Sequence, residues 1–290
     1  MPSRAVAVEH SFRGVTVMIV LRAILVVCIP AASEALAAGE NDGSADKPDI
    51  ARQRLEIMTS RIDGIVVSSK DPDFPKRLEP TPLFRYDDET RGYVDGTVWR
   101  LGEKGRPLAI ITTELHPRYL NGGPKVVYDF LSLTERPFAA RSADVAWSPR
   151  GSAVVLKALR DAPAPSSIAA KRLTQLKQQA RRFSGTQEVQ EIDKTFVHLR
   201  LLPREIDRYS PAPGDLADGA IFLFANGRNP ALLLVVETDG DQWRYGIGRL
   251  SSPSTLEMRL DDAVVWSGPR IESFDWSQPY TASNSPAEFP

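Results

Sequence analysis

Arg77-Leu78-Glu79-Pro80-Thr81-Pro82-Leu83-Phe84-Arg85-Tyr86 and, 123 residues later, Arg200-Leu201-Leu202-Pro203-Arg204-Glu205-Ile206-Asp207-Arg208-Tyr209 are two versions of one stretch of sequence. Five of the ten positions are identical, with no gap. At the same offset Asp95-Gly96 aligns with Asp218-Gly219, and Glu114 aligns with Glu237. Self-similarity at a long period is the signature of a repeated structural unit. We therefore predict two similar tandem units.

A helix is expected shortly before each of these stretches. We expect Asp49 to cap a helix that runs to about Ile62, and Ser166 or Ser167 to cap a second that reaches Phe183. Apolar residues repeat in both segments at spacings of three and four, which is typical of one buried helical face. The two apolar series are Ala51, Leu55, Met58 and Ile62, and Ala169, Leu173, Leu176, Ala180 and Phe183.

Short apolar runs separated by turn residues follow each helix and favour antiparallel strands. In the second unit they are 196–202, 220–225, 231–237, 242–250 and 256–266, and in the first unit 97–101, 108–115, 126–133 and 143–147, with a further run at 153–159. The predicted fold class is therefore α+β. Each unit is expected to be one helix packed on an antiparallel β-sheet, and approximate pseudo-twofold symmetry is expected to relate the units.

The N-terminal residues 1–38 have the three-part pattern of a cleaved secretory signal peptide. Arg4, Arg13 and Arg22 form a basic leader, residues 23–32 are small or apolar, and Ala35-Leu36-Ala37 suits signal peptidase. The apolar run is too short for a spanning helix, so we expect no stable transmembrane anchor. The protein is then exported, and periplasmic or extracellular. An uncleaved anchor that begins near residue 15, or a start at Met18, are the open alternatives.

The remaining boundaries follow from composition. Residues 39–48 are expected to be a flexible linker, 49–160 the first unit and 161–276 the second unit, beginning at a Pro- and Ala-rich connector. Residues 277–290 are polar and expected to form a loose C-terminal tail. The only cysteine, Cys28, falls in the leader, so the mature chain lacks disulfides and thiol nucleophiles.

Composition also narrows the function. Lys and Arg number 36 against 37 Asp and Glu, so no basic surface field indicates nucleic acid. The mature chain has two histidines and no metal-ligand spacing, phosphate-binding glycine loop or Gly-x-Ser-x-Gly motif. We accordingly expect no metal and no cofactor.

The best candidates for chemistry are Glu114 and Glu237, each at the end of the most apolar strand of its unit. Two neighbouring carboxyls in an apolar setting can serve as acid and base. Arg85 and Arg208 could orient them or bind an anion, and Tyr86 and Tyr209 could stack on a ligand. The competing interpretation is that each glutamate braces its own unit, because residues common to both units suit a shared scaffold.

Two further features concern the protein surface and the fold. The second expected helix carries a basic run that ends in Arg181 and Arg182, which suits weak contact with an anionic surface but more simply a solvated face. Residues 144–152 resemble the Trp-Ser-Pro-Asp-Gly turn of periplasmic β-propeller repeats, with Arg150 in place of the Asp. The resemblance implies a propeller, but that fold needs several such motifs about 40 residues apart, and the chain has one.

These features together predict an exported bacterial-type protein that acts as a non-catalytic binding or interaction protein of the cell envelope or exterior. The alternative is a hydrolase that uses a carboxylate pair where the two units meet.

Overall fold

The computed structural model describes residues 47–74, 78–88, 92–103, 105–119, 122–190, 195–210 and 218–290. All of these residues belong to one compact unit. The predicted signal peptide at 1–38 lies outside the described residues, as does most of the predicted linker at 39–48.

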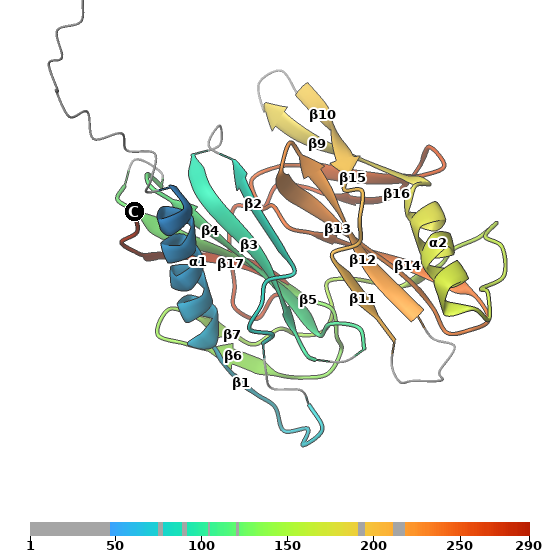
Figure 1. The fold of residues 1–290 in the computed structure, drawn as a ribbon, viewed down its shortest axis with the longest axis horizontal. Coiled ribbons are helices and arrows are strands. Elements are labelled where there is room, and N and C mark those ends of the chain that lie inside the picture. The colour runs from blue at the N-terminus through green and yellow to red at the C-terminus, as the bar shows by residue number, and fades with distance from the viewer. Residues whose placement is uncertain are drawn as a thin grey trace, which may run out of the picture. The chain divides into compact units, whose positions relative to one another are not determined.

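Antiparallel strands dominate the described chain, and two helices accompany them (Figure 1). The helices are α1 (Lys47–Asp63) and α2 (Ala169–Ala180). The five-stranded sheet has the order β17-β5-β4-β3-β2 and consists of β2 (Phe84–Asp88), β3 (Tyr93–Leu101), β4 (Ala109–His116), β5 (Lys125–Ser132) and β17 (Tyr280–Pro286). The three-stranded sheet consists of β1 (Val66–Ser68), β6 (Ala139–Arg141) and β7 (Ala146–Trp147).

The nine-stranded sheet has the order β16-β15-β9-β10-β12-β13-β14-β8, and β11 pairs with β12 beside this path. Its strands are β8 (Lys157–Ala158), β9 (Phe183–Gln190), β10 (Thr195–Leu201), β11 (Asp207–Tyr209), β12 (Asp218–Asn226), β13 (Asn229–Thr238), β14 (Trp243–Arg249), β15 (Leu256–Leu260) and β16 (Ala263–Gly268).

The predicted α+β fold of two helix-on-sheet units is therefore wrong. The structure is mostly β, with sheets of three, five and nine strands rather than one sheet behind each helix. The prediction failed because it assumed that each half of the chain forms one sheet from its own strands alone. The second half adds the hairpin of β9 and β10 and the hairpin of β15 and β16 to the sheet, and the chain end adds β17 to the five-stranded sheet.

Both larger sheets are buried on both faces, because successive side chains of a strand point to opposite sides. In β3, Trp99 belongs to a core with Met58 and Ile62 of α1. Its neighbour Val98 belongs instead to a core shared by the two larger sheets, together with Ile221 of β12. On the other side of the nine-stranded sheet, a third core includes Leu176 and Ala180 of α2. Strands that are buried on both faces have continuous apolar sequences, as β13 has.

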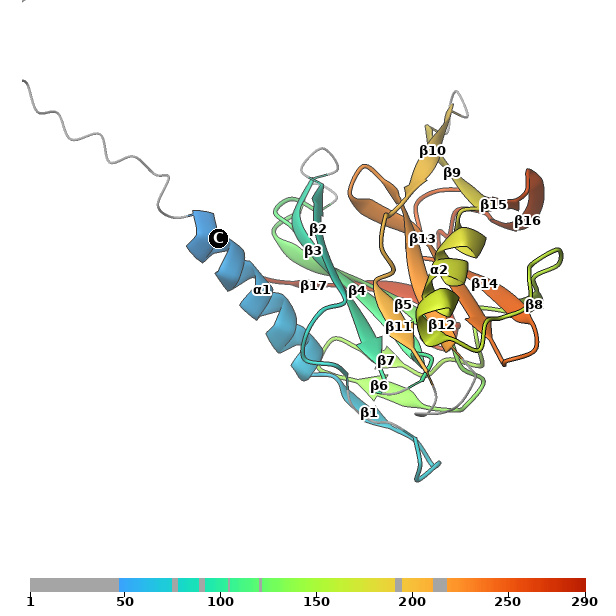
Figure 2. The ribbon, with the colours of Figure 1, turned by 45° about the vertical axis from the view of Figure 1, so that its right-hand side comes forward.

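The nine-stranded sheet curls, and a side chain of one edge strand, β8, reaches the other edge strand, β16. Lys157 of β8 donates from Nζ to the backbone oxygen of Val265 in β16 at 3.1 Å. Figure 2 shows the hairpin of β9 and β10 rising from this sheet, with α2 in front of β12. The result is a half-barrel whose interior is the core under α2.

The helix boundaries differ from the prediction in two respects. Asp49 lies inside the first turn of α1, and the residue before α2 is Ile168, which makes no side-chain capping bond. Phe183, predicted to continue the second helix, is instead the first residue of β9 and pairs with Leu260. Within the described ranges, no helix is both long and apolar enough to cross a membrane.

The predicted boundaries between parts of the chain do not coincide with the sheets. Tyr280–Pro286, expected to be a loose tail, forms β17 and pairs with β5 along its whole length. Lys157 and Ala158, assigned to the first unit, pair with β14 of the nine-stranded sheet. A strand from the first predicted unit thus joins the nine-stranded sheet, and a strand from the predicted tail joins the five-stranded sheet.

The aligned stretches nevertheless show the same strand register. Arg85 lies opposite Thr97 where β2 meets β3, and Arg208 lies opposite Ala220 where β11 meets β12. Glu114 is likewise opposite Gly96, and Glu237 is opposite Gly219. The origin of the chain as two copies of one unit stays a prediction, because this agreement covers the central strands and not the elements around them.

Candidate functional site

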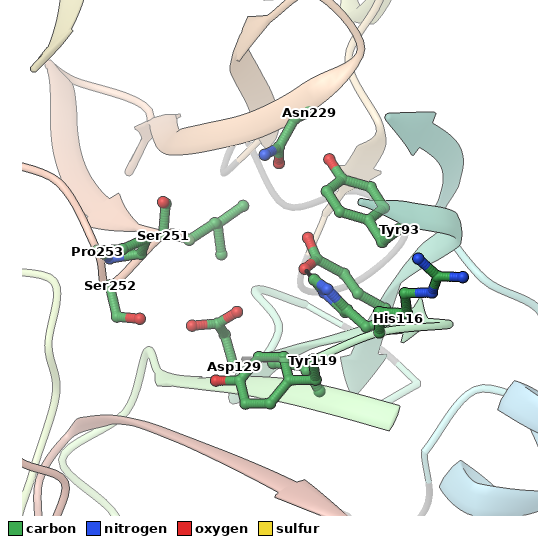
Figure 3. Close-up of a pocket in the computed structure, with 12 residues that line it drawn as sticks. Tyr93, His116, Tyr119, Asp129, Asn229, Ser251, Ser252 and Pro253 are labelled. Carbon is green, nitrogen blue, oxygen red and sulfur yellow. Dashed lines mark hydrogen bonds and ion pairs between the residues drawn. The ribbon is translucent and has the colours of Figure 1, made fainter. Parts of the chain in front are cut away.

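A cavity of about 340 Å³ lies where the five-stranded sheet meets the start of β13 and the loop after β14 (Figure 3). We call it the inter-sheet cavity. Its size falls in the range of small-molecule sites. It is lined by Tyr93, Glu114, His116, Arg118, Tyr119, Val127, Asp129, Asn229, Leu250, Ser251, Ser252 and Pro253.

Two carboxyl groups, those of Glu114 and Asp129, line this cavity from adjacent strands. Glu114 of β4 pairs with Val127 of β5, so Asp129 is its diagonal neighbour on the same face. Such neighbours have Cα atoms about 7–8 Å apart, within reach of long side chains. The two carboxyls therefore share one side of the cavity.

Each carboxyl already has protein partners. Glu114 accepts a hydrogen bond from the Tyr86 hydroxyl at 3.0 Å, and its other oxygen lies 3.0 Å from Nε2 of His116. Asp129 accepts hydrogen bonds from the Tyr280 hydroxyl and, at 3.2 Å, from Thr112. These contacts orient both groups and leave acceptor sites on their oxygens, since a carboxylate has about four.

Burial raises the pKa of Asp129 to about 7, and the negative charge of Glu114 adds to this effect. The hydrogen bonds from Tyr280 and Thr112 and the charge of Arg249 act in the opposite direction. Desolvation dominates because the residue is only 7% exposed. Asp129 consequently gains or loses a proton near neutral pH.

Aromatic rings form a second wall of the cavity. The ring centroid of His116 lies 5.2 Å from that of Tyr93 and 5.4 Å from that of Tyr119. Lys125 places its Nζ 5.8 Å from the centroid of Tyr119. Figure 3 shows Tyr93 and His116 together on one side of the cavity, across from Ser251. The rings give a ligand an apolar and polarisable surface.

The loop after β14 is fastened by Arg249. Its guanidinium donates to the backbone oxygens of Ser251 at 2.8 Å and of Ser254 at 2.9 Å, and lies 5.3 Å from the ring centroid of Tyr280. Tyr280 in turn donates to Asp129. The loop from one sheet and the carboxyl from the other are therefore held by one chain of contacts.

Asn229 projects its side-chain amide into the cavity from the first residue of β13 (Figure 3). The residue is 9% exposed. Within the described ranges, its amide forms no hydrogen bond with another protein group. The amide faces the open space of the cavity, where it offers a bound molecule two hydrogen-bond donors and an acceptor.

The predicted site residues form two parallel sets of contacts. Arg85 pairs with Asp95 and donates to the backbone oxygen of Ala51 at 2.5 Å. Arg208 pairs with Asp218 at 2.7 Å and donates to the backbone oxygen of Ala169 at 2.8 Å. Each arginine therefore fastens a helix to a strand, which is a bracing role.

Tyr86 and Tyr209 also bond within their own sheets. Tyr86 donates to Glu114, as described above, and Tyr209 donates to Glu237 at 2.6 Å. Both rings are buried, and the pKa of each tyrosine is raised well above its ordinary value. The largest cause is burial, and the second is the negative charge of the adjacent glutamate. Neither ring lies on the wall of the inter-sheet cavity.

Glu237 is placed differently from Glu114. It accepts from Arg106 at 3.2 Å as well as from Tyr209, and it is absent from the lining of the inter-sheet cavity. In the part of the chain that the structure describes, the two glutamates make no contact with each other. The acid–base role of this pair stays a prediction, but the carboxyl that shares a cavity with Glu114 is that of Asp129.

Much of the basic run around α2 is engaged inside the protein. Arg172 is buried and bonds Asp218 at 2.9 Å, and Lys177 lies 3.0 Å from Glu205. Arg182 pairs with Asp261 at 2.5 Å and donates to the backbone oxygen of Arg160. Arg181 is exposed. Of the two arginines proposed for an anionic surface, Arg181 alone is left in solvent without an ion pair within the described ranges.

Sequence reasoning missed Asp129 and Asn229. One signal was present, because Asp129 interrupts the apolar run Val126-Val127-Tyr128-Asp129-Phe130-Leu131, where an acidic residue is costly unless it has a role. Sequence reasoning also gave no reason to select His116, which is the last residue of β4 and lies on the cavity wall. Asn229 follows a turn, and nothing in its neighbours distinguishes it.

Among the residues with a described position, no group of three or more His, Cys, Asp or Glu side chains is arranged to hold a metal ion. Comparison with protein-family models, with curated proteins and with solved structures gives no match. The site must therefore be interpreted from its own chemistry.

Proposed function

We propose that the chain is an exported, non-catalytic binding protein and that the inter-sheet cavity is its ligand site. The observation that carries this proposal is the cavity itself, into which the amide of Asn229 projects from one sheet beside the carboxyls of Glu114 and Asp129 from the other. Ligand sites are concave, mostly apolar, and contain a few polar groups that fix orientation. Export is supported by the leader-like composition of residues 1–38.

Preorganisation also supports binding. Tyr86, Thr112 and Tyr280 orient the two carboxyls, and Arg249 fixes the loop that carries Ser251. Groups that are held in place before a ligand arrives lose little conformational entropy on binding. The cavity is thus built of groups fixed in advance by both sheets.

A ligand screen tests the proposal. Ligand-detected NMR on the purified chain would use a panel of amines, sugars, carboxylates and nucleotides. We expect at least one class to bind, and Asn229→Ala to weaken that binding at least ten-fold. Gln178→Ala is the matched control, because it removes an exposed amide of α2, a helix that contributes no residue to the cavity lining. Binding that Asn229→Ala leaves intact, or no binding by any class, contradicts the proposal.

A hydrolase is a second candidate function, favoured by two carboxyls of one cavity and by the pKa of about 7 at Asp129. Asp129 would donate a proton and Glu114 would accept one, as in acid–base pairs whose environments differ. Chromogenic esters, phosphates and glycosides provide the assay. Turnover that both Asp129→Asn and Glu114→Gln abolish would establish catalysis, whereas the binding proposal expects no turnover.

A further inference from the structure

We propose that the ligand of the inter-sheet cavity is a small organic amine, with its ammonium group between the carboxyls of Glu114 and Asp129. This inference rests on the proposed function, because it takes the cavity to be a ligand site. It adds the chemical class of the ligand and the residues that select it.

The carboxyls of Glu114 and Asp129 favour a ligand that donates hydrogen bonds. Carboxylate oxygens only accept, and those of Glu114 and Asp129 have acceptor sites beyond the bonds from Tyr86, Thr112 and Tyr280. An ammonium group has three donors and no acceptor. Its hydrogen bonds to carboxylates are charge-assisted and stronger than neutral ones.

The aromatic wall suits the same ligand. Cations are attracted to the faces of tyrosine rings, and Tyr93 and Tyr119 line the cavity next to the carboxyls. Lys125 lies 5.8 Å from the ring centroid of Tyr119, within the range of a cation–π contact. The apolar part of an amine would lie against Val127 and Leu250.

The basic groups near the cavity are directed elsewhere. Arg249 donates to backbone oxygens of the loop after β14, and Lys125 donates to Asn284 at 2.8 Å. Arg118 lines the cavity but is exposed to solvent. The carboxyls of Glu114 and Asp129 therefore make the inter-sheet cavity predominantly negative. An anionic ligand would meet the two carboxyls, whereas an ammonium group adds to the partial compensation of their charge by Arg249.

Matched probes test the class. n-Butylamine and benzylamine carry a positive charge, n-butanol and benzyl alcohol are their neutral counterparts, and benzoate is an anion of similar size. Binding to the purified chain would be followed by ligand-detected NMR at pH 8. We expect at least one amine to bind ten-fold or more tightly than its alcohol, and benzoate not to bind.

Substitutions locate the bound amine. Asp129→Asn and Glu114→Gln are each expected to weaken amine binding ten-fold or more. Asp87→Asn, which removes an exposed carboxylate paired with Arg228, should leave it unchanged. Circular dichroism would check that each variant folds. Amine binding that survives both cavity substitutions overturns the inference.

The pH dependence of amine binding tests the inference without any substitution. Because burial raises the pKa of Asp129 to about 7, the carboxyl is mostly neutral at pH 6 and mostly charged at pH 8. Amine binding should weaken about ten-fold between pH 8 and pH 6. The other titratable or charged groups on the elements around Asp129 are Glu114, His116, Arg118, Tyr119, Tyr93, Arg249 and Tyr280. Asp129→Asn should flatten the dependence and His116→Gln should preserve it.

The outcomes separate the two proposals. If a sugar, carboxylate or nucleotide binds in a manner that depends on Asn229 and no amine does, the amine inference fails while the binding function stands. If nothing in either panel binds, both fail. If amines bind more tightly at pH 6 than at pH 8, the placement of the ammonium group beside Asp129 is wrong.

Discussion

Arg100 of β3 and Asp207 of β11 form an ion pair across the contact between the two larger sheets, with Nη1 2.5 Å from Oδ2. Their side chains are only 8% and 10% exposed. Arg100 also donates to the backbone oxygens of Gly102 at 2.7 Å and Gly105 at 2.9 Å. All three nitrogens of this buried guanidinium thus donate a hydrogen bond, and one of the partners belongs to the other sheet.

Asp207→Ala should destabilise the fold by about 3 kcal/mol, because it leaves the charge of Arg100 buried without its partner. Urea denaturation of wild type and variant measures the difference. Asp87→Ala is the control, since Asp87 pairs with Arg228 in solvent at 2.9 Å, and exposed pairs contribute at most about 1 kcal/mol. Equal losses of unfolding free energy in the two variants would show that the cross-sheet ion pair contributes no more than the exposed pair.

Stability should fall as the pH rises from about 4 to about 7, because of Asp129. Its pKa is about 7 in the folded chain against an ordinary value of 3.8. Between these values the folded state binds a proton that the unfolded state has released, so raising the pH favours unfolding. The total effect is on the order of 4 kcal/mol, fully expressed above pH 7.

Urea denaturation at pH 5 and pH 8 tests this, with Asp129→Asn as the comparison. The variant should lose this component of the pH dependence and be relatively more stable at pH 8. A wild-type chain whose stability is the same as the variant's at both pH values would contradict the proton affinity assigned to Asp129.

The sequence predicted the central strands well but not the sheets that they form. β4, β12 and β13 were recognised because their apolar runs reflect local burial. β9 was missed, and its first residue, Phe183, was assigned to the helix because it continues the helical spacing of Leu176 and Ala180. β17 is a strand through its pairing with β5, some 150 residues earlier, which no local pattern records.

Gly96→Ala and Gly219→Ala should each destabilise the fold by about 1–3 kcal/mol. A Cβ at Gly96 would lie 2.7 Å from the ring of Tyr86, and one at Gly219 would lie 2.5 Å from the ring of Tyr209. The displaced tyrosines would also lose their bonds to the two glutamates. Thermal unfolding provides the measurement.

Gly123→Ala is the control, because a Cβ there meets nothing within 4 Å. Comparable losses at Gly96 and Gly219, with little change at Gly123, are expected from the matching register of the two sheets. A tolerated substitution at either strand position would mean that its tyrosine is not packed as described.

The candidate site was less predictable than the strands. The alignment of the two stretches selected Arg85, Tyr86, Arg208 and Tyr209, whose contacts brace each sheet internally. The alignment also selected Glu114, which does line the cavity, but it did not select Asp129 and Asn229. The cavity forms where two sheets meet, and a single sequence does not record which loop of one sheet faces which strand of the other.

Tyr280→Phe should raise the pKa of Asp129 above its value of about 7. The Tyr280 hydroxyl donates to this carboxyl and favours its charged form, and the phenylalanine ring would still lie beneath Arg249. Carbon-13 NMR titration of the Asp129 carboxyl measures the change. Tyr245→Phe is the control, since Tyr245 is buried in the core under α2.

At pH 7 the Asp129 carboxyl of the Tyr280→Phe variant would be mostly protonated, so amine binding should weaken although no group on the cavity wall has changed. An unchanged titration would mean that Tyr280 positions β17 without tuning the site.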